Sequence, residues 1–199
     1  CVLFMAASKV GAVAVPLNYR LAPAELAFII KDANTKALLI LDRMEALLAA
    51  LRERLPADTA VITRDQPDSL QFNSWCDQFP ATAPAAEVQQ GDAYLQLYTS
   101  GTTGNPKGVV SSHSNILTLT IMNVVAAPAR PDQGSGGIVC APLFHIGGAG
   151  SAIAGIFNGQ HMVLHRVFDP AQVVSDIENY SVSAIFLVPA MIMAVLQLP

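Results

Sequence analysis

Short apolar runs alternate with helical patterns through the first third of this 199-residue chain, and this alternation restricts the fold more than any other feature. The runs at 12–17, 36–41 and 59–63 have the length and hydrophobicity of buried parallel strands. Helical patterns lie between them, at 23–33 and 43–55. Strands and helices in this order predict an α/β fold of layered, parallel-rich sheets with flanking helices.

The alternation continues after residue 90, beyond a stretch of weak pattern that contains one predicted short helix at 74–78. Further elements are predicted in sequence: helices at 115–126, 148–157 and 170–180, and strands at 138–141, 162–164 and 184–188. Ser114 and Asp169 are residue types that cap helix N-termini. The glycines at 134–137 predict an exposed loop.

The composition excludes several functional classes. Charged residues make up only 13% of the sequence, against about 25% in an average domain, and none lies between Asp132 and Arg166. Such a segment is expected to be buried within a larger body. A net charge of −4 provides no basic surface for nucleic acid. Gly and Pro interrupt the apolar stretches, which argues against a transmembrane helix. The odd, unpatterned cysteines indicate a reducing, cytoplasmic setting.

The segment at 98–108 combines glycines, hydroxyl side chains and one lysine between two apolar runs. Glycines allow backbone N–H groups to turn toward an anion, and Lys107 adds a mobile positive charge. This chemistry suits a polyphosphate, although a glycine-rich surface turn is the alternative. It is not the G-x-x-x-x-G-K-[ST] nucleotide loop, because Gly108 follows the lysine and Pro106 precedes it.

Residues 99–108, Thr-Ser-Gly-Thr-Thr-Gly-Asn-Pro-Lys-Gly, closely resemble the phosphate-binding signature of the adenylate-forming (AMP-binding) superfamily. The segments at 11–18 and 168–170 resemble other blocks of this family. The block at 141–148 resembles its acyl-pocket block, and the Phe144-His145 form is more similar to acyl-CoA synthetases than to peptide-synthetase adenylation domains. The resemblance extends over nearly the whole chain.

The resemblance implies activation of a carboxylic acid, most simply a fatty acid, to an acyl-adenylate and then to acyl-CoA. ATP and coenzyme A would be the co-substrates, Mg²⁺ would be the cofactor, and the acid would be a small molecule. Phosphate contacts are then expected from Thr99, Ser100, Gly101, Thr102, Thr103, Gly104 and Lys107. Substrate contacts are expected from His145, Gly147 and Gly148. The family's adenine, ribose and catalytic-lysine elements have no counterpart in these residues.

These absences predict that residues 1–199 are part of an N-terminal domain, without the C-terminal domain and inactive in isolation. An adenylation domain, a luciferase-like enzyme and a non-catalytic phosphate-binding or interaction module remain alternatives. A homo-oligomer is also compatible with the sequence. Two weaker patterns are disfavoured: Gly148-Ala149-Gly150 lacks the third glycine of a dinucleotide fingerprint, and His161 and His165 lack the glutamate of a zinc-protease motif.

Overall fold

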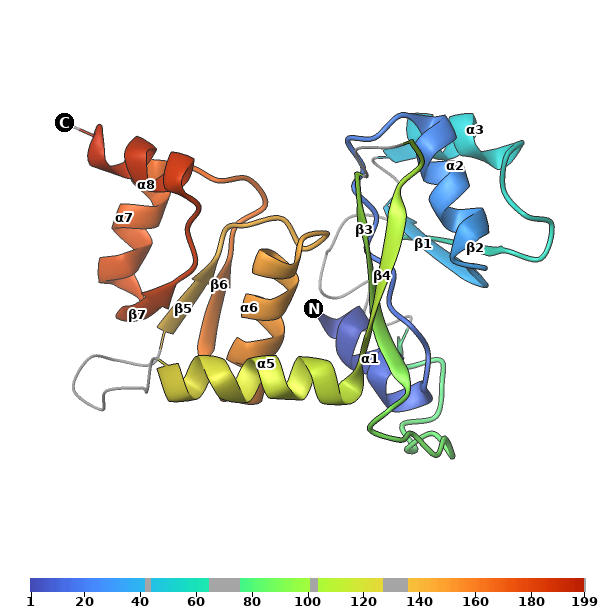
Figure 1. Cartoon of the computed structure of the whole chain (residues 1–199), viewed down its shortest axis with the longest axis horizontal. Coiled ribbons are helices and arrows are strands. Elements are labelled where there is room, and N and C mark those ends of the chain that lie inside the picture. The colour runs from blue at the N-terminus through green and yellow to red at the C-terminus, as the bar shows by residue number, and fades with distance from the viewer. Residues whose placement is uncertain (42–43, 65–75, 101–103, 127–135, 199) are drawn as a thin grey trace. The chain divides into compact units, whose positions relative to one another are not determined.

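The computed structural model describes residues 1–41, 44–64, 76–100, 104–126 and 136–198 (Figure 1). It divides into two compact units. Unit 1 comprises Cys1–Pro16, Glu87–Leu97 and Val110–Pro199, and unit 2 comprises Leu17–Ala86 and Tyr98–Val109. The chain passes between the units after Pro16, after Ala86, and within strands β3 (Ala93–Thr99) and β4 (Lys107–Ser112), which are neighbours in a two-stranded sheet.

Unit 2 contains a parallel pair of strands with two helices. Its elements are α2 (Pro23–Asp32), β1 (Ala37–Leu41), α3 (Glu45–Arg52) and β2 (Ala60–Arg64). In the parallel ladder Ala37 lies opposite Ala60 and Leu41 opposite Arg64. One core joins the helices to β1 through the buried side chains of Leu26, Ile30, Leu38 and Leu51. Alternate residues of β1 are buried, as expected for a strand that is covered on one face.

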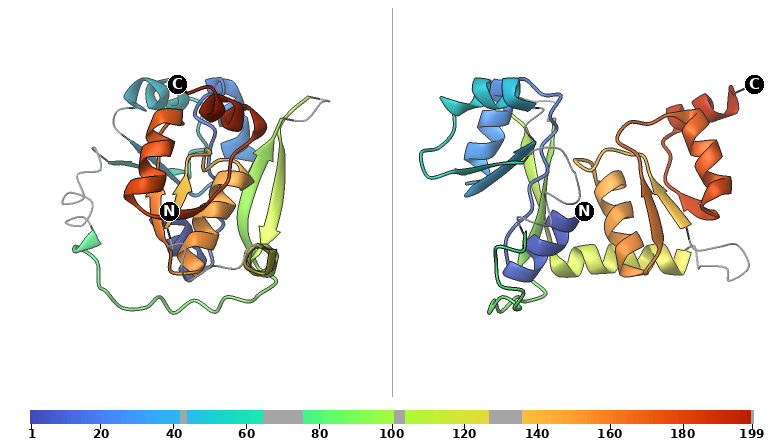
Figure 2. Two further views of the ribbon diagram at one scale, coloured as in Figure 1. Left: turned by 90° about the vertical axis from the view of Figure 1, so that its left-hand side faces the viewer. Right: turned by 180° about the vertical axis from the view of Figure 1, so that it is seen from behind.

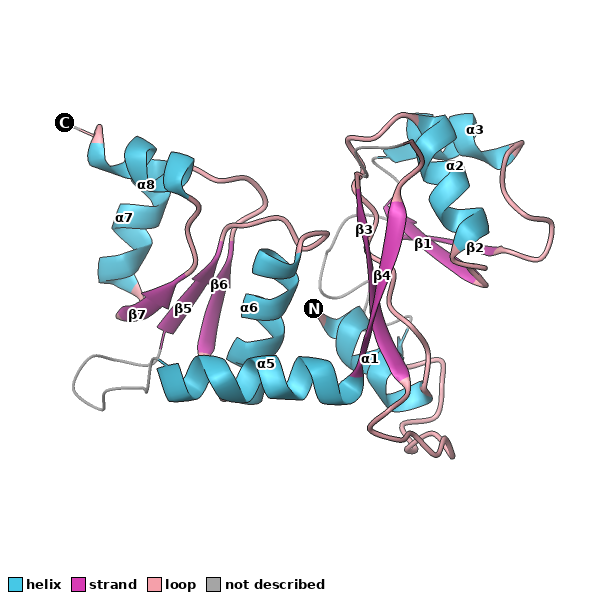
Figure 3. Cartoon of the chain, in the orientation of Figure 1, coloured by secondary structure: helices cyan, strands magenta, loops and turns pink. Residues whose placement is uncertain are grey.

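Unit 1 contains a parallel three-stranded sheet in the order β6-β5-β7. Its remaining elements are α1 (Val2–Val10), α5 (His113–Ala126), β5 (Gly136–Val139), α6 (Ile146–Phe157), β6 (His161–Leu164), α7 (Pro170–Asn179), β7 (Val182–Ile185) and α8 (Pro189–Leu196). Figures 2 and 3 show α6 on one side of this sheet and α7 and α8 on the other. Helices on both faces and parallel strands confirm the predicted α/β class.

Two expectations for individual segments are wrong. The run at 12–17 forms no extended strand and contributes a single parallel bridge between Ala14 and Leu95. Gly136 and Gly137 do not lie in an exposed loop, since they begin the buried strand β5. A Cβ on Gly136 would lie 2.5 Å from the carbonyl oxygen of Tyr180, and one on Gly137 would lie 2.9 Å from Sδ of Met162. These glycines therefore permit a close approach of neighbouring segments.

The helix caps follow local chemistry. Asp169 caps α7 as predicted, because its carboxylate accepts hydrogen bonds from the N–H groups of Ala171 and Gln172 at 2.9 and 3.1 Å. Helix α5 begins at His113, and its cap is Ser112 rather than Ser114. The Asn115 N–H donates to Oγ of Ser112 at 3.2 Å, and the Ser112 N–H donates to Oδ1 of Asn115 at 3.0 Å. This reciprocal pair is a capping box two residues earlier than the sequence pattern indicates.

A buried polar pair connects α7 to the end of β6. Nε2 of His165 lies 2.8 Å from Oδ2 of Asp176, and both side chains are less than a tenth exposed. Gln172 donates a second hydrogen bond to Oδ1 of Asp176 at 2.9 Å. The hydrogen bond from Gln172 lowers the pKa of Asp176 below its ordinary value, and the hydrogen bond and charge of His165 act in the same direction against desolvation.

We expect Asp176→Asn to lower the thermal midpoint of the protein at neutral pH. A carboxyl group whose pKa is lowered on folding stabilises the fold above its ordinary pKa, and this stabilisation is lost as the pH falls through the lowered value. The difference between wild type and variant should therefore shrink below about pH 4. Thermal melts at a series of pH values measure it, with the exposed Glu178→Gln as control. A pH-independent difference would contradict the titration argument.

Candidate functional site

The part of the glycine-rich segment from Thr99 to Lys107 joins β3 to β4 and belongs to unit 2. Thr99, Ser100 and Gly104 are exposed at its two sides. Gly104 has a φ of 128°, a backbone conformation that side chains other than glycine rarely adopt. The predicted site residues Gly101, Thr102 and Thr103 lie outside the described residues. The described part of the segment therefore presents two hydroxyl groups and a glycine conformation suited to a tight turn.

Lys107 is the first residue of β4 and is exposed. It forms no hydrogen bond or ion pair with any residue that the structure describes. Its ammonium charge is therefore not neutralised by a described carboxylate and is available to an anion. Position, exposure and charge all fit the phosphate contact that the sequence predicts.

Tyr98, directly before this segment, makes a contact that the sequence analysis missed. Its hydroxyl donates a hydrogen bond to Oδ2 of Asp32 at 2.6 Å, across 66 residues of sequence. Burial raises the pKa of Tyr98, and the hydrogen bond to Asp32 and its negative charge raise it further. No local pattern reveals this pair, because the two residues are far apart in sequence and only the fold brings them together.

The predicted substrate contacts lie in unit 1, at the start of α6. His145 is the N-cap residue, with an extended backbone (φ −115°, ψ 149°), and its imidazole is exposed. The N–H of His145 donates to the carbonyl of Pro142 at 3.1 Å. Its ring lies 4.9 Å from that of the buried Phe144, centroid to centroid. The turn thus buries the phenylalanine and leaves the histidine accessible to a ligand.

The two glycines after His145 are in tight contact with neighbouring segments. A Cβ on Gly148 would overlap the carbonyl oxygen of Pro142 and lie 2.5 Å from that of Ala141. A Cβ on Gly147 would lie 2.5 Å from Cε1 of Phe186. Gly148 is therefore required by backbone packing, whereas Gly147 faces the ring of an aromatic side chain. Both glycines keep the first turn of α6 close to the end of the parallel sheet.

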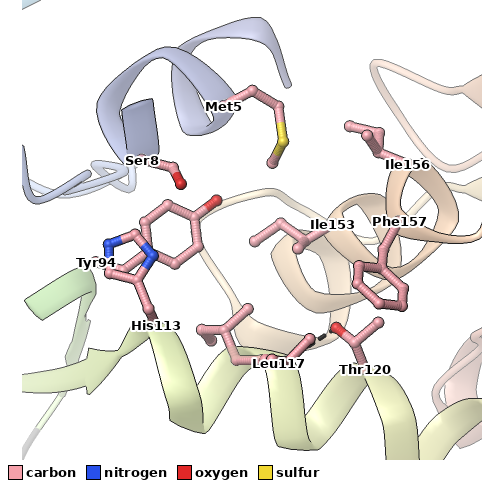
Figure 4. A pocket seen from close by; sticks show the side chains of 10 residues that line it. Met5, Ser8, Tyr94, His113, Leu117, Thr120, Ile153, Ile156 and Phe157 are labelled. Carbon is pink, nitrogen blue, oxygen red and sulfur yellow. Dashed lines mark hydrogen bonds between the residues drawn. The ribbon is translucent and has the colours of Figure 1, made fainter. Parts of the chain in front are cut away.

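A pocket of about 280 Å³ opens in unit 1 beside α5 and α6 (Figure 4). Its lining consists of Met5, Ser8, Tyr94, His113, Ile116, Leu117, Thr120, Ile153, Ile156 and Phe157. His113, interpreted from the sequence as structural, stacks on Tyr94 with 4.9 Å between ring centroids. The Tyr94 hydroxyl and Nε2 of His113 are buried without a hydrogen-bond partner among the described residues, and burial raises the pKa of Tyr94. None of the described residues that line this apolar pocket is a lysine or arginine that could bind phosphate.

In the described part of the chain, no group of three or more His, Cys, Asp or Glu side chains is placed to hold a metal ion. The two histidines of the disfavoured zinc pattern are used otherwise: His161 packs edge-on against Tyr180, and His165 pairs with Asp176. Within the same described part, no helix combines the length and hydrophobicity needed to cross a membrane.

Comparison with known proteins finds one family over the whole chain. The AMP-binding enzyme family matches residues 1–199. A feruloyl-CoA synthase from Amycolatopsis sp is 31% identical over 199 residues, which cover 98% of this chain and 37% of that protein. The long-chain-fatty-acid–CoA ligase FadD13 of Mycobacterium tuberculosis is also 31% identical, over 100% of this chain and 39% of its own length. The chain thus spans less than half the length of these relatives.

Solved structures share the fold. The inhibitor-bound N-terminal domain of FACL13 from Mycobacterium tuberculosis superposes with a TM-score of 0.85 at 28% identity. The match covers 100% of this chain and 49% of that domain. The arrangement of helices and parallel strands described above is therefore found in a known N-terminal domain.

Proposed function

This chain is a member of the AMP-binding enzyme family, and from this premise we propose that it is part of a ligase that activates a carboxylic acid with ATP and transfers the acyl group to coenzyme A. The observation that carries the proposal is the β3–β4 connection. It presents Thr99, Ser100 and the charge of Lys107, which no described residue pairs, beside a glycine with a φ of 128°. An anion is the natural ligand of such a segment.

The proposed chemistry has two steps. An oxygen of the substrate carboxylate attacks the α-phosphorus of ATP, the bond to the bridging oxygen breaks, and pyrophosphate leaves. The thiol of coenzyme A then attacks the acyl carbon, and AMP leaves as the thiol proton is released. Lys107 and the hydroxyl groups hold the β- and γ-phosphates and stabilise the charge of the leaving pyrophosphate. Bound Mg²⁺ would supply further neutralisation of the phosphate oxygens.

The acid is proposed to bind at the start of α6, where the exposed His145 and the glycines 147 and 148 form the turn. Imidazole donates a hydrogen bond to a carboxylate without a permanent charge of its own, which suits positioning rather than nucleophilic attack. We favour a fatty acid as the substrate, because the relative FadD13 is named as a long-chain-fatty-acid–CoA ligase. An aromatic acid is the alternative substrate, because another relative is named as a feruloyl-CoA synthase.

We further propose that residues 1–199 form part of the N-terminal domain of a longer enzyme and have no activity alone. Relatives of more than twice this length support the proposal. The adenine, ribose and catalytic-lysine elements of the family would then come from outside these residues. Three free cysteines, Cys1, Cys76 and Cys140, are compatible with the cytoplasm as the location.

Carboxylate-dependent exchange of labelled pyrophosphate into ATP tests this function in the full-length protein. We expect exchange with at least one acid from a panel of short, long and aromatic carboxylates. The variant His145→Ala should raise the KM of that acid by about tenfold and change the KM of ATP by less than about twofold, because one hydrogen bond to a charged group is lost. His161→Ala, in the same unit and outside the site, is the control. No exchange with any acid, or unchanged carboxylate kinetics in His145→Ala, would contradict the assignment.

A further inference from the structure

The hydrogen bond between Tyr98 and Asp32 stands at the entrance to the proposed phosphate segment. Tyr98 is the residue before Thr99, with which β3 ends. Asp32 is the last residue of α2, and both residues belong to unit 2. The hydroxyl–carboxylate distance of 2.6 Å is that of a charge-assisted hydrogen bond. Strand β3 is therefore attached to a helix of unit 2 one residue before the segment begins.

Helix stability does not explain the acidic residue at this position. The C-terminal end of a helix carries a partial negative charge, so a carboxylate in the last turn is unfavourable and a cation is preferred. Asp32 occupies such a position, next to Lys31, in the last turn of α2. Its observed use is to accept the hydrogen bond from Tyr98. The pair is thus better understood as a fixed attachment for β3 than as a stabilising feature of α2.

We propose that the Tyr98–Asp32 hydrogen bond positions Thr99 and Ser100, the described hydroxyl residues that follow Tyr98, for ATP, which makes Tyr98 and Asp32 positioning residues. This inference rests on the phosphate-binding function proposed for the segment from Thr99 to Lys107. The phosphate segment follows β3 and precedes β4, and the pairing of these two strands restrains both of its ends. The hydrogen bond fixes the end of β3 against α2. A phosphate site of exposed hydroxyls and a lysine depends on such fixed ends, because small displacements weaken several contacts together.

The donor remains protonated over the range in which ligases are assayed, since burial and Asp32 both raise the pKa of Tyr98. The hydroxyl therefore remains a hydrogen-bond donor at neutral and mildly alkaline pH, and its removal is the direct way to test the attachment. Tyr98→Phe keeps the ring and removes only the donor. Asp32→Asn keeps a carbonyl oxygen as acceptor, whereas Asp32→Leu keeps the branching of the side chain and removes both acceptor oxygens.

The test is steady-state kinetics of the full-length ligase. We expect Tyr98→Phe and Asp32→Leu each to raise the KM of ATP by about three- to tenfold, less than the full effect of losing a charge-assisted hydrogen bond, because this one acts on ATP only through the position of the phosphate-binding residues. The KM of the carboxylic acid should change by less than about twofold. Asp32→Asn should recover most of the ATP affinity, and the double variant Tyr98→Phe/Asp32→Leu should be no worse than either single variant. Tyr180→Phe, on the surface of unit 1, controls for the loss of a phenol.

Three outcomes would overturn the inference. Equal changes in the KM of ATP and of the acid, or additive effects of the two single variants, would show that the pair does not act on the ATP site as one unit. A lowered thermal midpoint with unchanged ATP kinetics would reduce the hydrogen bond to a structural role. Lys107→Ala in the same assay separates this failure from that of the proposed function. If Lys107→Ala impairs ATP use and Tyr98→Phe does not, only the positioning role is wrong.

Discussion

Replacement of Lys107 by alanine is expected to slow acyl-adenylate formation in the full-length enzyme by about 10- to 100-fold. Two unit charges 4 Å apart interact by about 4 kcal/mol at an effective dielectric constant near 20, and the exposure of Lys107 lowers its share of this energy. The lost stabilisation falls on the step in which pyrophosphate leaves, since the lysine is proposed to contact the β- and γ-phosphates. Thioester formation from supplied acyl-adenylate should change by less than about threefold, because no pyrophosphate leaves in that step.

Rapid-quench measurement of the two half-reactions separates these effects. Lys107→Arg retains the charge and should recover part of the adenylation rate, although the planar guanidinium directs its donors differently. Lys31→Ala removes an exposed lysine from α2 of the same unit and is the matched control. Equal slowing of both half-reactions by Lys107→Ala would exclude a role restricted to the leaving pyrophosphate.

Local patterns account for most of the fold prediction. Continuous apolar runs and capping residues such as Asp169 act over a few positions, so the sequence indicates the elements and their parallel arrangement. The errors arise where packing overrides local chemistry. Gly136 and Gly137 have the composition of a loop, yet they begin a buried strand, against which the carbonyl of Tyr180 and the side chain of Met162 pack closely. That approach is a tertiary fact which no local pattern contains.

The candidate site also has a part that the sequence predicts and a part that only the fold reveals. The β3–β4 segment and His145 were identified from their residue order, and the structure adds the exposure of Lys107 and of the imidazole. The Tyr98–Asp32 hydrogen bond joins positions 66 residues apart and depends on the fold. Likewise, the Tyr94 hydroxyl beside His113, for which the described residues supply no hydrogen-bond partner, follows from the packing of α5 against β3 in unit 1. Residue chemistry can thus be inferred from sequence, whereas long-range partners require the fold.

Gly148→Ala is expected to destabilise the protein more than any other single methyl addition considered above. The new Cβ would overlap the carbonyl oxygen of Pro142 and lie 2.5 Å from that of Ala141. Both are backbone atoms, so they cannot move aside as the end of a flexible side chain can. Overpacking of this kind costs about 1–3 kcal/mol, and rigid neighbours place the expected cost at the upper end or beyond.

The same helix provides a matched control for Gly148→Ala. A Cβ on Gly150 would meet Cδ2 of Leu119 at 3.6 Å and Cδ1 of Ile146 at 3.8 Å, which are ordinary contacts. Gly150→Ala should therefore gain helix propensity of up to about 1 kcal/mol at no steric cost. Thermal melts of the full-length protein should show a lower midpoint for Gly148→Ala and an unchanged or higher one for Gly150→Ala. Equal midpoints would show that the first turn of α6 is not held against the 141–142 backbone. Where Gly148→Ala still folds, relief of the overlap must displace this turn, and the KM of the carboxylic acid should rise because His145 moves with it.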